Sequence, residues 1–369
     1  MSENNVGITS AEIIDRFNKL KNQIEENSNV KENMDLLCDI MEEEILNSGE
    51  SEENKKQMLK NLRSLYSTET NIMLVGATGC GKSSTINALF NVNSAADADN
   101  IESDYVEIAK VGSSADPETK NVERYKIGNL ILWDTPGLGD GTNEDESHKE
   151  IITNLLRAVD DEGKALIDLV LVILDGSTKD LGTSYKILND VIIPELKDDT
   201  GRILIALNQA DIAMKTGRHW DYEKNKPDEV LVKYLEEKVQ SIKERIKSES
   251  DLDIDPVYYC AGYAEESGAV VKPYNLSKLL YYILNALPAE KRVAIIEGIS
   301  NDKQNYESND DDEDYNEEIK GSIYSTFDTV FNSCVNFGKK VLGIPGAVIG
   351  GVVGSIAGCF ASIFDSIFN

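Results

Sequence analysis

Histidine is nearly absent from the sequence, and its scarcity excludes two classes of site. The 369 residues contain only His148 and His219, so a histidine-based zinc site and a Ser-His-Asp triad both lack parts. Five cysteines are spread along the chain without a C-x-x-C pair, which favours reduced thiols in a cytosolic protein. Residues 1–10 are polar and carry no signal-peptide pattern.

Basic residues are also scarce relative to acidic ones. The chain has 37 Lys and Arg against 66 Asp and Glu, which gives a formal net charge of -29. Neutralising the phosphates of a nucleic acid needs clustered Lys and Arg side chains. We therefore do not expect nucleic acid as a partner.

A glycine-rich segment follows the apolar run 71–75. It reads G-A-T-G-C-G-K-S from Gly76 to Ser83 and fits the phosphate-binding pattern G-x-x-x-x-G-K-[ST]. In that pattern backbone N–H groups turn toward a di- or triphosphate, Lys82 reaches the β- and γ-phosphates, and the Ser83 hydroxyl is a Mg²⁺ ligand. A plain glycine-rich turn is the alternative. The predicted phosphate-binding residues are Gly76, Thr78, Gly79, Cys80, Gly81, Lys82, Ser83 and Ser84.

A second motif, D-T-P-G at 134–137, directly follows the apolar run 130–133. At the carboxyl end of a buried strand, Asp134 would hold the water shell of Mg²⁺, and the N–H of Gly137 would approach the γ-phosphate because no side chain intervenes. Taken alone, this segment is equally compatible with a type I turn that has proline at its second position. Its place after the glycine-rich segment favours the phosphate interpretation.

A third motif, N-Q-A-D at 208–211, closes the apolar run 202–207. The carboxylate of Asp211 can accept hydrogen bonds from both the ring N–H and the exocyclic amine of guanine. Adenine has no matching donors. The motif therefore predicts GTP rather than ATP as the nucleotide.

With these motifs in this order, the chain from Asn71 to Leu287 resembles the translation-factor class of P-loop GTPases, and within it the Era-like branch. The resemblance implies an α/β domain with a mostly parallel sheet, GTP and GDP as ligands, Mg²⁺ as cofactor and GTP hydrolysis as the activity. It places the switch I threonine at Thr119, with Ser113 and Ser114 as alternatives. The implied catalytic residues are Lys82, Thr119 and Gly137, the implied metal ligands are Ser83, Thr119 and Asp134, and the implied base-binding residues are Asn208, Gln209, Asp211 and Ala261.

Four positions depart from the pattern of that class. Leu138 stands where some GTPases have a water-orienting glutamine, so we expect slow intrinsic hydrolysis. Gly79 replaces the asparagine of potassium-activated relatives, so activation by K⁺ is not supported. Gln209 replaces a lysine whose stem lies over the base, and Cys260 replaces a serine. These two changes should weaken nucleotide affinity modestly without changing its specificity.

The rest of the chain is predicted to flank this domain with helices. We divide it into an N-terminal helical region (1–68), the GTPase domain (69–289), a helix and acidic linker (290–320) and a glycine-rich apolar tail (321–369). Apolar residues recur at helical spacing in three stretches of the first region. These helices would either brace the GTPase domain or mediate oligomerisation or partner binding. The acidic stretch from Asn301 to Glu318 is predicted to be a disordered linker.

The tail contains no charged residue from Val341 to Phe364, and four of its glycines recur four residues apart. On a helix these glycines form a smooth stripe that suits close helix packing in a bilayer, and the uncharged stretch would be about 36 Å long, enough to cross a membrane. The alternatives are a glycine-packed helical hairpin folded on the protein, and disorder. Helical flanks with an apolar tail also resemble the order of elements in immunity-related and dynamin-like GTPases.

Three functional hypotheses follow. In the first, a GTP-hydrolysing enzyme uses its nucleotide cycle to control self-assembly or membrane engagement. In the second, a soluble GTP-gated switch binds a protein partner and hydrolyses little GTP. In the third, nucleotide binding gates a pore formed by the tail. The expected location is the cytoplasm, with membrane association through residues 341–364.

Overall fold

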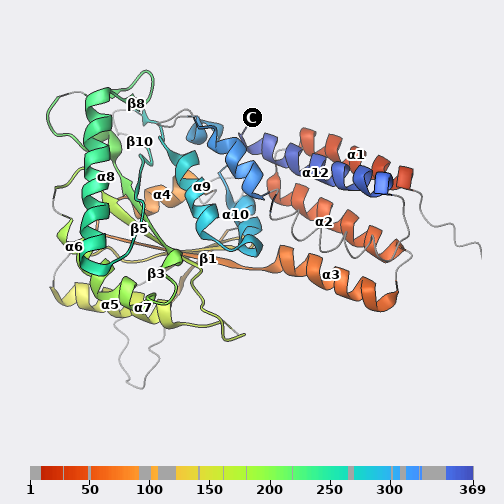
Figure 1. Cartoon of the computed structure of the whole chain (residues 1–369), viewed down its shortest axis with the longest axis horizontal. Coiled ribbons are helices and arrows are strands. Elements are labelled where there is room, and N and C mark those ends of the chain that lie inside the picture. The colour runs from red at the N-terminus through yellow and green to blue at the C-terminus, as the bar shows by residue number, and fades with distance from the viewer. Residues whose placement is uncertain are drawn as a thin grey trace, which may run out of the picture.

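The computed structural model describes residues 10–27, 29–48, 51–90, 101–106, 122–139, 142–160, 162–179, 181–217, 219–264, 270–300, 302–307, 313–323, 325 and 346–368. They form a layered α/β domain with a helical extension on one side (Figure 1). The strands are β1 (Thr70–Gly76), β2 (Ile101–Val106), β3 (Val122–Ile127), β4 (Leu130–Asp134), β5 (Leu169–Asp175), β6 (Ile203–Asn208), β7 (Trp220–Asp221), β8 (Lys226–Pro227), β9 (Val257–Tyr258), β10 (Tyr263–Ala264) and β11 (Val270–Val271).

The helices around the main sheet are α4 (Lys82–Leu89), α5 (Thr142–Arg157), α6 (Gly182–Ile187), α7 (Ile193–Glu195), α8 (Glu229–Ser250), α9 (Leu276–Ala286) and α10 (Arg292–Gly298). A π-helical turn, Leu188–Ile192, joins α6 to α7. The helical extension consists of α1 (Ser10–Glu26), α2 (Val30–Asn47), α3 (Glu52–Ser67) and α12 (Gly346–Phe368).

Among the described residues the main sheet has seven strands in the order β2-β3-β4-β1-β5-β6-β9. β3 is antiparallel to β2 and β4, and the pairs from β4 to β9 are parallel. The prediction of an α/β domain with a mostly parallel sheet is therefore confirmed. The registers pair Leu74 with Asp134 and Asp175 with Asn208, so the carboxyl ends of β4, β1, β5 and β6 lie along one edge of the sheet.

Each face of the sheet supports a separate apolar core. β1 and most of β5 are buried on both faces, as expected for central parallel strands with continuous apolar sequence. One core packs β1 and β5 against α4, α9 and α10 and continues without a break into the helical extension. The other core lies between the opposite face and helices α5, α6 and α8. The helical extension therefore shares its core with only one face of the sheet.

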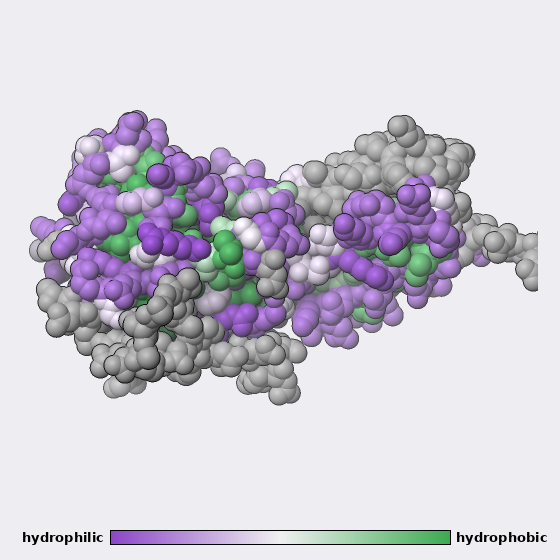
Figure 2. Space-filling view, turned by 90° about the horizontal axis from the view of Figure 1, so that it is seen from below, coloured by the Kyte–Doolittle hydropathy of each residue, from purple (hydrophilic) through white to green (hydrophobic). Residues whose placement is uncertain are grey.

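The N-terminal stretches with apolar residues at helical spacing are helices, as predicted. Asn29 and Ser51 cap α2 and α3 by accepting hydrogen bonds from backbone N–H groups of the first turn. The apolar sides of α1 and α2 pack into one core, in which Phe17, Leu20 and Leu37 are at most 1% exposed. In Figure 2, hydrophilic side chains cover most of the visible described surface of both the α/β domain and the extension.

Residues 346–368 of the tail form the helix α12, which packs lengthwise on α1 (Figure 1). Phe360 and Phe364 are buried in the core of the extension, and the Cys359 thiol donates a hydrogen bond to the Phe17 carbonyl at 3.3 Å. Of the three predicted arrangements, packing on the protein describes residues 346–368, and the other arm of the predicted hairpin falls outside the described residues. No helix in the described part of the chain is long and apolar enough to cross a membrane. Residues 326–345, which include the start of the uncharged stretch, lie outside the described residues.

The prediction of a disordered acidic linker is wrong for the stretches that the structure describes. Residues 303–306 form a short 3-10 helix and 315–323 an α-helix. Tyr306 within the acidic stretch, and Ile319 and Ile323 directly after it, are at most 3% exposed. Burial of these apolar side chains stabilises the segment despite its high charge. The α-helix 315–323 also crosses the predicted boundary between residues 320 and 321.

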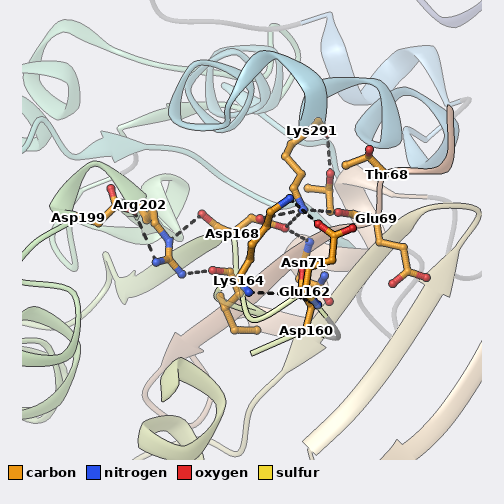
Figure 3. Close-up of polar contacts among 12 residues, drawn as sticks. Thr68, Glu69, Asn71, Asp160, Glu162, Lys164, Asp168, Asp199, Arg202 and Lys291 are labelled. Carbon is orange, nitrogen blue, oxygen red and sulfur yellow. Dashed lines mark hydrogen bonds and ion pairs between the residues drawn. The ribbon is translucent and has the colours of Figure 1, made fainter. Parts of the chain in front are cut away.

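An ion pair ties the segment after α9 to the sheet (Figure 3). Lys291 lies 3.0 Å from Asp168, which precedes β5, and its ammonium also donates to the Glu69 carbonyl at 2.6 Å. Asp168 in turn accepts from the N–H of Asn71 at 2.8 Å, and Thr70 donates to the Lys291 carbonyl at 2.6 Å. Burial raises the pKa of Asp168, and the contacts with Asn71 and Lys291 oppose that shift. This cluster fixes the start of β1, where the extension joins the sheet.

Candidate nucleotide site

The glycine-rich segment forms the loop between β1 and α4, as the motif requires. Gly81 has φ +93°, a left-handed conformation that glycine adopts without strain, and α4 begins at the next residue. A Cβ at this position would lie 2.2 Å from the Asn208 amide nitrogen. Lys82 is buried, and its ammonium donates to the carbonyls of Gly76 and Ala77 at 3.3 and 3.4 Å. The lysine therefore folds back over its own loop.

The predicted metal ligands Ser83 and Asp134 are in direct contact. The Ser83 hydroxyl donates to Oδ2 of Asp134 at 2.6 Å. The other carboxylate oxygen, Oδ1, is buried and has no hydrogen-bond partner among the described residues. Burial raises the pKa of Asp134, an effect that the Ser83 hydrogen bond and the charge of Lys82 oppose. A buried carboxylate with one unsatisfied oxygen, next to a hydroxyl, fits an oxygen-ligated divalent cation such as Mg²⁺.

The segment after Asp134 is bound directly to the phosphate loop. The Thr78 N–H donates to the Leu138 carbonyl at 2.9 Å, and the Leu138 N–H donates to the Gly76 carbonyl at 3.3 Å. Gly137 lies so close to the loop that a Cβ there would be 2.2 Å from the Thr78 hydroxyl oxygen. The Leu138 side chain is 2% exposed and belongs to the core on the α5 face. The sequence predicted that leucine cannot orient water, and the structure turns its side chain away from the loop surface.

Two residues of α5 contact this segment, and neither has a role in the site that the sequence predicts. Nδ1 of His148 lies 2.7 Å from the Gly137 carbonyl, and the Gly139 N–H donates to Asp145 at 2.7 Å. His148 is 5% exposed. No sequence signal marks these contacts, because the spacing from Gly137 to His148 depends on the loop before α5.

Asn208 joins the base-binding segments to the phosphate loop. Its side-chain amide donates to the Cys80 carbonyl at 3.0 Å, and its Oδ1 accepts from the Ala261 N–H at 3.0 Å. Gln209, at φ 62°, donates to the Gly79 carbonyl at 2.9 Å. Two direct hydrogen bonds therefore attach the predicted base-binding residues to the phosphate loop, and a third joins Asn208 to Ala261.

Asp211 is the second buried carboxylate of the site. Its Oδ2 has no hydrogen-bond partner among the residues that the structure describes. Burial raises the pKa of Asp211, and a hydrogen bond from Cys260 opposes this shift. Burial also raises the pKa of the Cys260 thiol well above its ordinary value, so the thiol remains protonated as a donor. Asp211 also lines a cavity of about 410 Å³, together with Trp220 and Tyr222.

One predicted position cannot be placed. Thr119 and its alternatives Ser113 and Ser114 lie outside the described residues. The other predicted residues come together along the carboxyl edge of the sheet, at the ends of β1, β4 and β6 and in the segment after β9.

One family model matches part of the chain, and several solved structures are similar to it at low identity. Residues 71–209 match the family described as 50S ribosome-binding GTPase. Among solved structures, the G domain of the T. maritima FeoB iron transporter is 17% identical with a TM-score of 0.31, over 59% of this chain and 98% of that one. Toc33 from Arabidopsis thaliana in complex with Mg²⁺ and GMPPNP is 15% identical with a TM-score of 0.34, over 60% and 89% of the two chains.

Translation elongation factor SelB from Methanococcus maripaludis is 14% identical with a TM-score of 0.32, over 59% of this chain. The match spans 34% of the SelB chain. No curated protein matches the chain. The sheet order, the strand-loop-helix at residues 70–89 and the family match over residues 71–209 together identify this part of the chain as a P-loop GTPase domain.

Proposed function

We propose that the protein binds GTP with Mg²⁺, hydrolyses it slowly, and uses the nucleotide cycle to control self-assembly or membrane engagement through the helical extension. The observation that carries the nucleotide part is the pair of buried carboxylates, each with an oxygen that lacks a hydrogen-bond partner among the described residues. Asp134 lies beside Ser83, where a cation would bind. Asp211 lies on the loop that Asn208 attaches to the phosphate site.

The chain's own residues have separable roles in this proposal. Backbone N–H groups of the phosphate loop and the ammonium of Lys82 bind the phosphates, and the N–H of Gly137 approaches the γ-phosphate. Ser83 and Asp134, together with Thr119, hold Mg²⁺. When bound, Mg²⁺ supplies positive charge that stabilises the negative charge developing on the phosphates. Asp211 and the Ala261 N–H select guanine.

Slow hydrolysis follows from the position of Leu138. Its side chain lies in the core and its backbone is hydrogen-bonded to the phosphate loop at both ends, so this residue cannot position a water molecule. A second copy of the chain or a partner would supply the missing group. The same observation also favours the second candidate function, a GTP-gated switch that binds a protein partner with little hydrolysis.

The link to the helical extension runs through the turn between β3 and β4. Asn129 in this turn donates its side-chain amide to the Tyr66 carbonyl at the end of α3, and its backbone N–H donates to Glu297 of α10 at 3.0 Å. β4 leads directly from this turn to Asp134. A shift of β4 on nucleotide exchange would therefore reach α3 and α10. We place the protein in the cytoplasm, within the Era-like branch. Membrane engagement through residues 341–364 would require α12 to leave its packing on α1, which buries Phe360 and Phe364.

Calorimetry and a GTPase assay over a range of protein concentrations test this proposal. We expect the full-length protein to bind GTP and GDP with Mg²⁺ but not ATP, and its specific GTPase activity to rise with protein concentration. Binding of ATP as tight as that of GTP would contradict the guanine assignment. A specific activity that stays flat over a wide dilution range would favour the monomeric switch. Flotation of the full chain with liposomes, in GDP and in a GTP analogue, tests membrane engagement separately.

A further inference from the structure

His148 is a buried histidine that the proposed mechanism does not use. It lies in the second turn of α5, and the acceptor facing its Nδ1 is the backbone carbonyl of Gly137, 2.7 Å away. A carbonyl only accepts hydrogen bonds, so Nδ1 carries the proton and donates. The contact therefore fixes the tautomer of the ring and binds α5 to the glycine that faces the γ-phosphate.

With the hydrogen bond from His148, the Gly137–Leu138 peptide group is hydrogen-bonded at both ends. The carbonyl of Gly137 and the N–H of Leu138 belong to the same planar unit. The N–H end donates to the Gly76 carbonyl in the phosphate loop at 3.3 Å, and the carbonyl end accepts from His148. The next contact along the chain, from the Gly139 N–H to Asp145, also involves α5. The peptide is thus held between the phosphate loop on one side and α5 on the other.

We propose that His148 is a positioning residue for GTP hydrolysis, which sets the orientation of the Gly137–Leu138 peptide and, through it, the direction of the Gly137 N–H. Glycine has no Cβ to limit its φ and ψ angles, so external hydrogen bonds must define its conformation. The loop contacts alone leave the carbonyl end without a donor. His148 supplies this donor from a helix, which is more rigid than the loop. This inference rests on the proposed GTP hydrolysis and adds the residue that makes Gly137 competent for it.

The test compares three variants of the full-length protein. H148F keeps a ring of similar size but cannot donate. H148N places its amide nitrogen where Nδ1 lies and restores the donor. E150A changes an exposed residue on the same helix and is the matched control. For each variant, kcat and KM for GTP are measured together with the affinities for GDP and for a non-hydrolysable GTP analogue.

We expect H148F to lower kcat roughly tenfold, the effect of losing one well-placed hydrogen bond, and to weaken binding of the GTP analogue while GDP affinity stays unchanged. H148N should recover most of both losses, and E150A should behave as the unaltered protein. Unchanged kcat in H148F would overturn the proposal, and so would an equal loss of GDP and analogue affinity, which indicates a general structural role. If the unaltered protein binds neither nucleotide, the proposed function itself fails. If it binds both and H148F has the same kcat and affinities, only the role of His148 is refuted.

Discussion

At the carboxyl edge of the sheet, residues are placed by hydrogen bonds to backbone carbonyls, whereas in the helical extension they are placed by burial of apolar side chains. The phosphate loop, the segment after β4 and the base-binding loop are joined by bonds from Thr78, Leu138, Asn208 and Gln209. In the extension, α1 and α12 meet through side chains such as Phe17 and Phe364, both at most 1% exposed.

The difference teaches how each region responds to change. Hydrogen bonds are directional, so a single substitution at the site should alter binding with little effect on the fold. Burial is non-directional and cumulative, so a substitution in the extension should change stability first. The two regions also share one continuous apolar core on the α9 and α10 face. A substitution that disrupts this core in the extension would therefore also destabilise the α/β domain.

The largest expected effect is on binding. Lys82→Ala removes the ammonium from the centre of the phosphate loop, and GTP affinity should fall on the order of a thousandfold, because the phosphate charge loses its buried partner. Thermal unfolding should change less than nucleotide affinity, since the ammonium of Lys82 donates to the Gly76 and Ala77 carbonyls of its own loop. Calorimetric titration with GTP and GDP measures the loss. Substitution of Lys60, an exposed lysine on α3, provides the control. A variant that still binds GTP normally would refute the phosphate assignment.

In the extension, the corresponding test is Phe364→Ala, which should lower stability instead of nucleotide affinity. The ring is fully buried and stacks on Phe368 with centroids 6.4 Å apart. Its removal should lower the free energy of unfolding by about 3–5 kcal/mol, as measured by chemical denaturation. Ser366→Ala on the same helix, whose hydroxyl bonds only within its own turn, should cost under about 0.5 kcal/mol. Equal stability of both variants would mean that α12 does not pack on α1 in solution.

A smaller effect should separate affinity from specificity. Asp211→Asn replaces one carboxylate oxygen by an amide donor, so GTP affinity should fall roughly tenfold to a hundredfold while xanthine nucleotides, which offer a carbonyl at that position, gain affinity. Competition binding with GTP and XTP measures the ratio. If XTP binding does not improve relative to GTP, Asp211 does not contact the exocyclic group of the base.

The smallest effect concerns Asp134. Burial raises its folded pKa above the unfolded value, so the folded state binds the proton more tightly and stability rises as pH falls through the folded pKa. At neutral pH the buried charge is a cost, and Asp134→Asn should raise the unfolding free energy of the nucleotide-free protein. The same variant should lose Mg²⁺-dependent hydrolysis.

Thermal unfolding at neutral and at mildly acidic pH measures this effect. The stability advantage of the variant should shrink as pH falls, because the native carboxyl then becomes neutral as well. A gap that widens at acidic pH would contradict the raised pKa.

Much of the fold and of the site was predictable, because both depend on local signals. Continuous apolar runs at β1, β5 and β6 predict buried parallel strands, and the glycine pattern at residues 76–83 predicts a loop between strand and helix. The acidic linker was mispredicted because composition records charge but not which face of a short helix carries Tyr315 and Ile319. The spacing of these two residues in the sequence does not show that their side chains are buried.

The sequence by itself determined the P-loop, the guanine motif and the helices on either side, because each depends on residue types at fixed short spacing. Only the tertiary structure decided that α12 packs on α1, that Leu138 turns into the core, and that His148 meets Gly137. These contacts join residues that are far apart in the chain, or that are separated by loops whose length no local pattern fixes. Their formation depends on which surfaces remain to be buried once the sheet and its helices have assembled, and no local pattern encodes that.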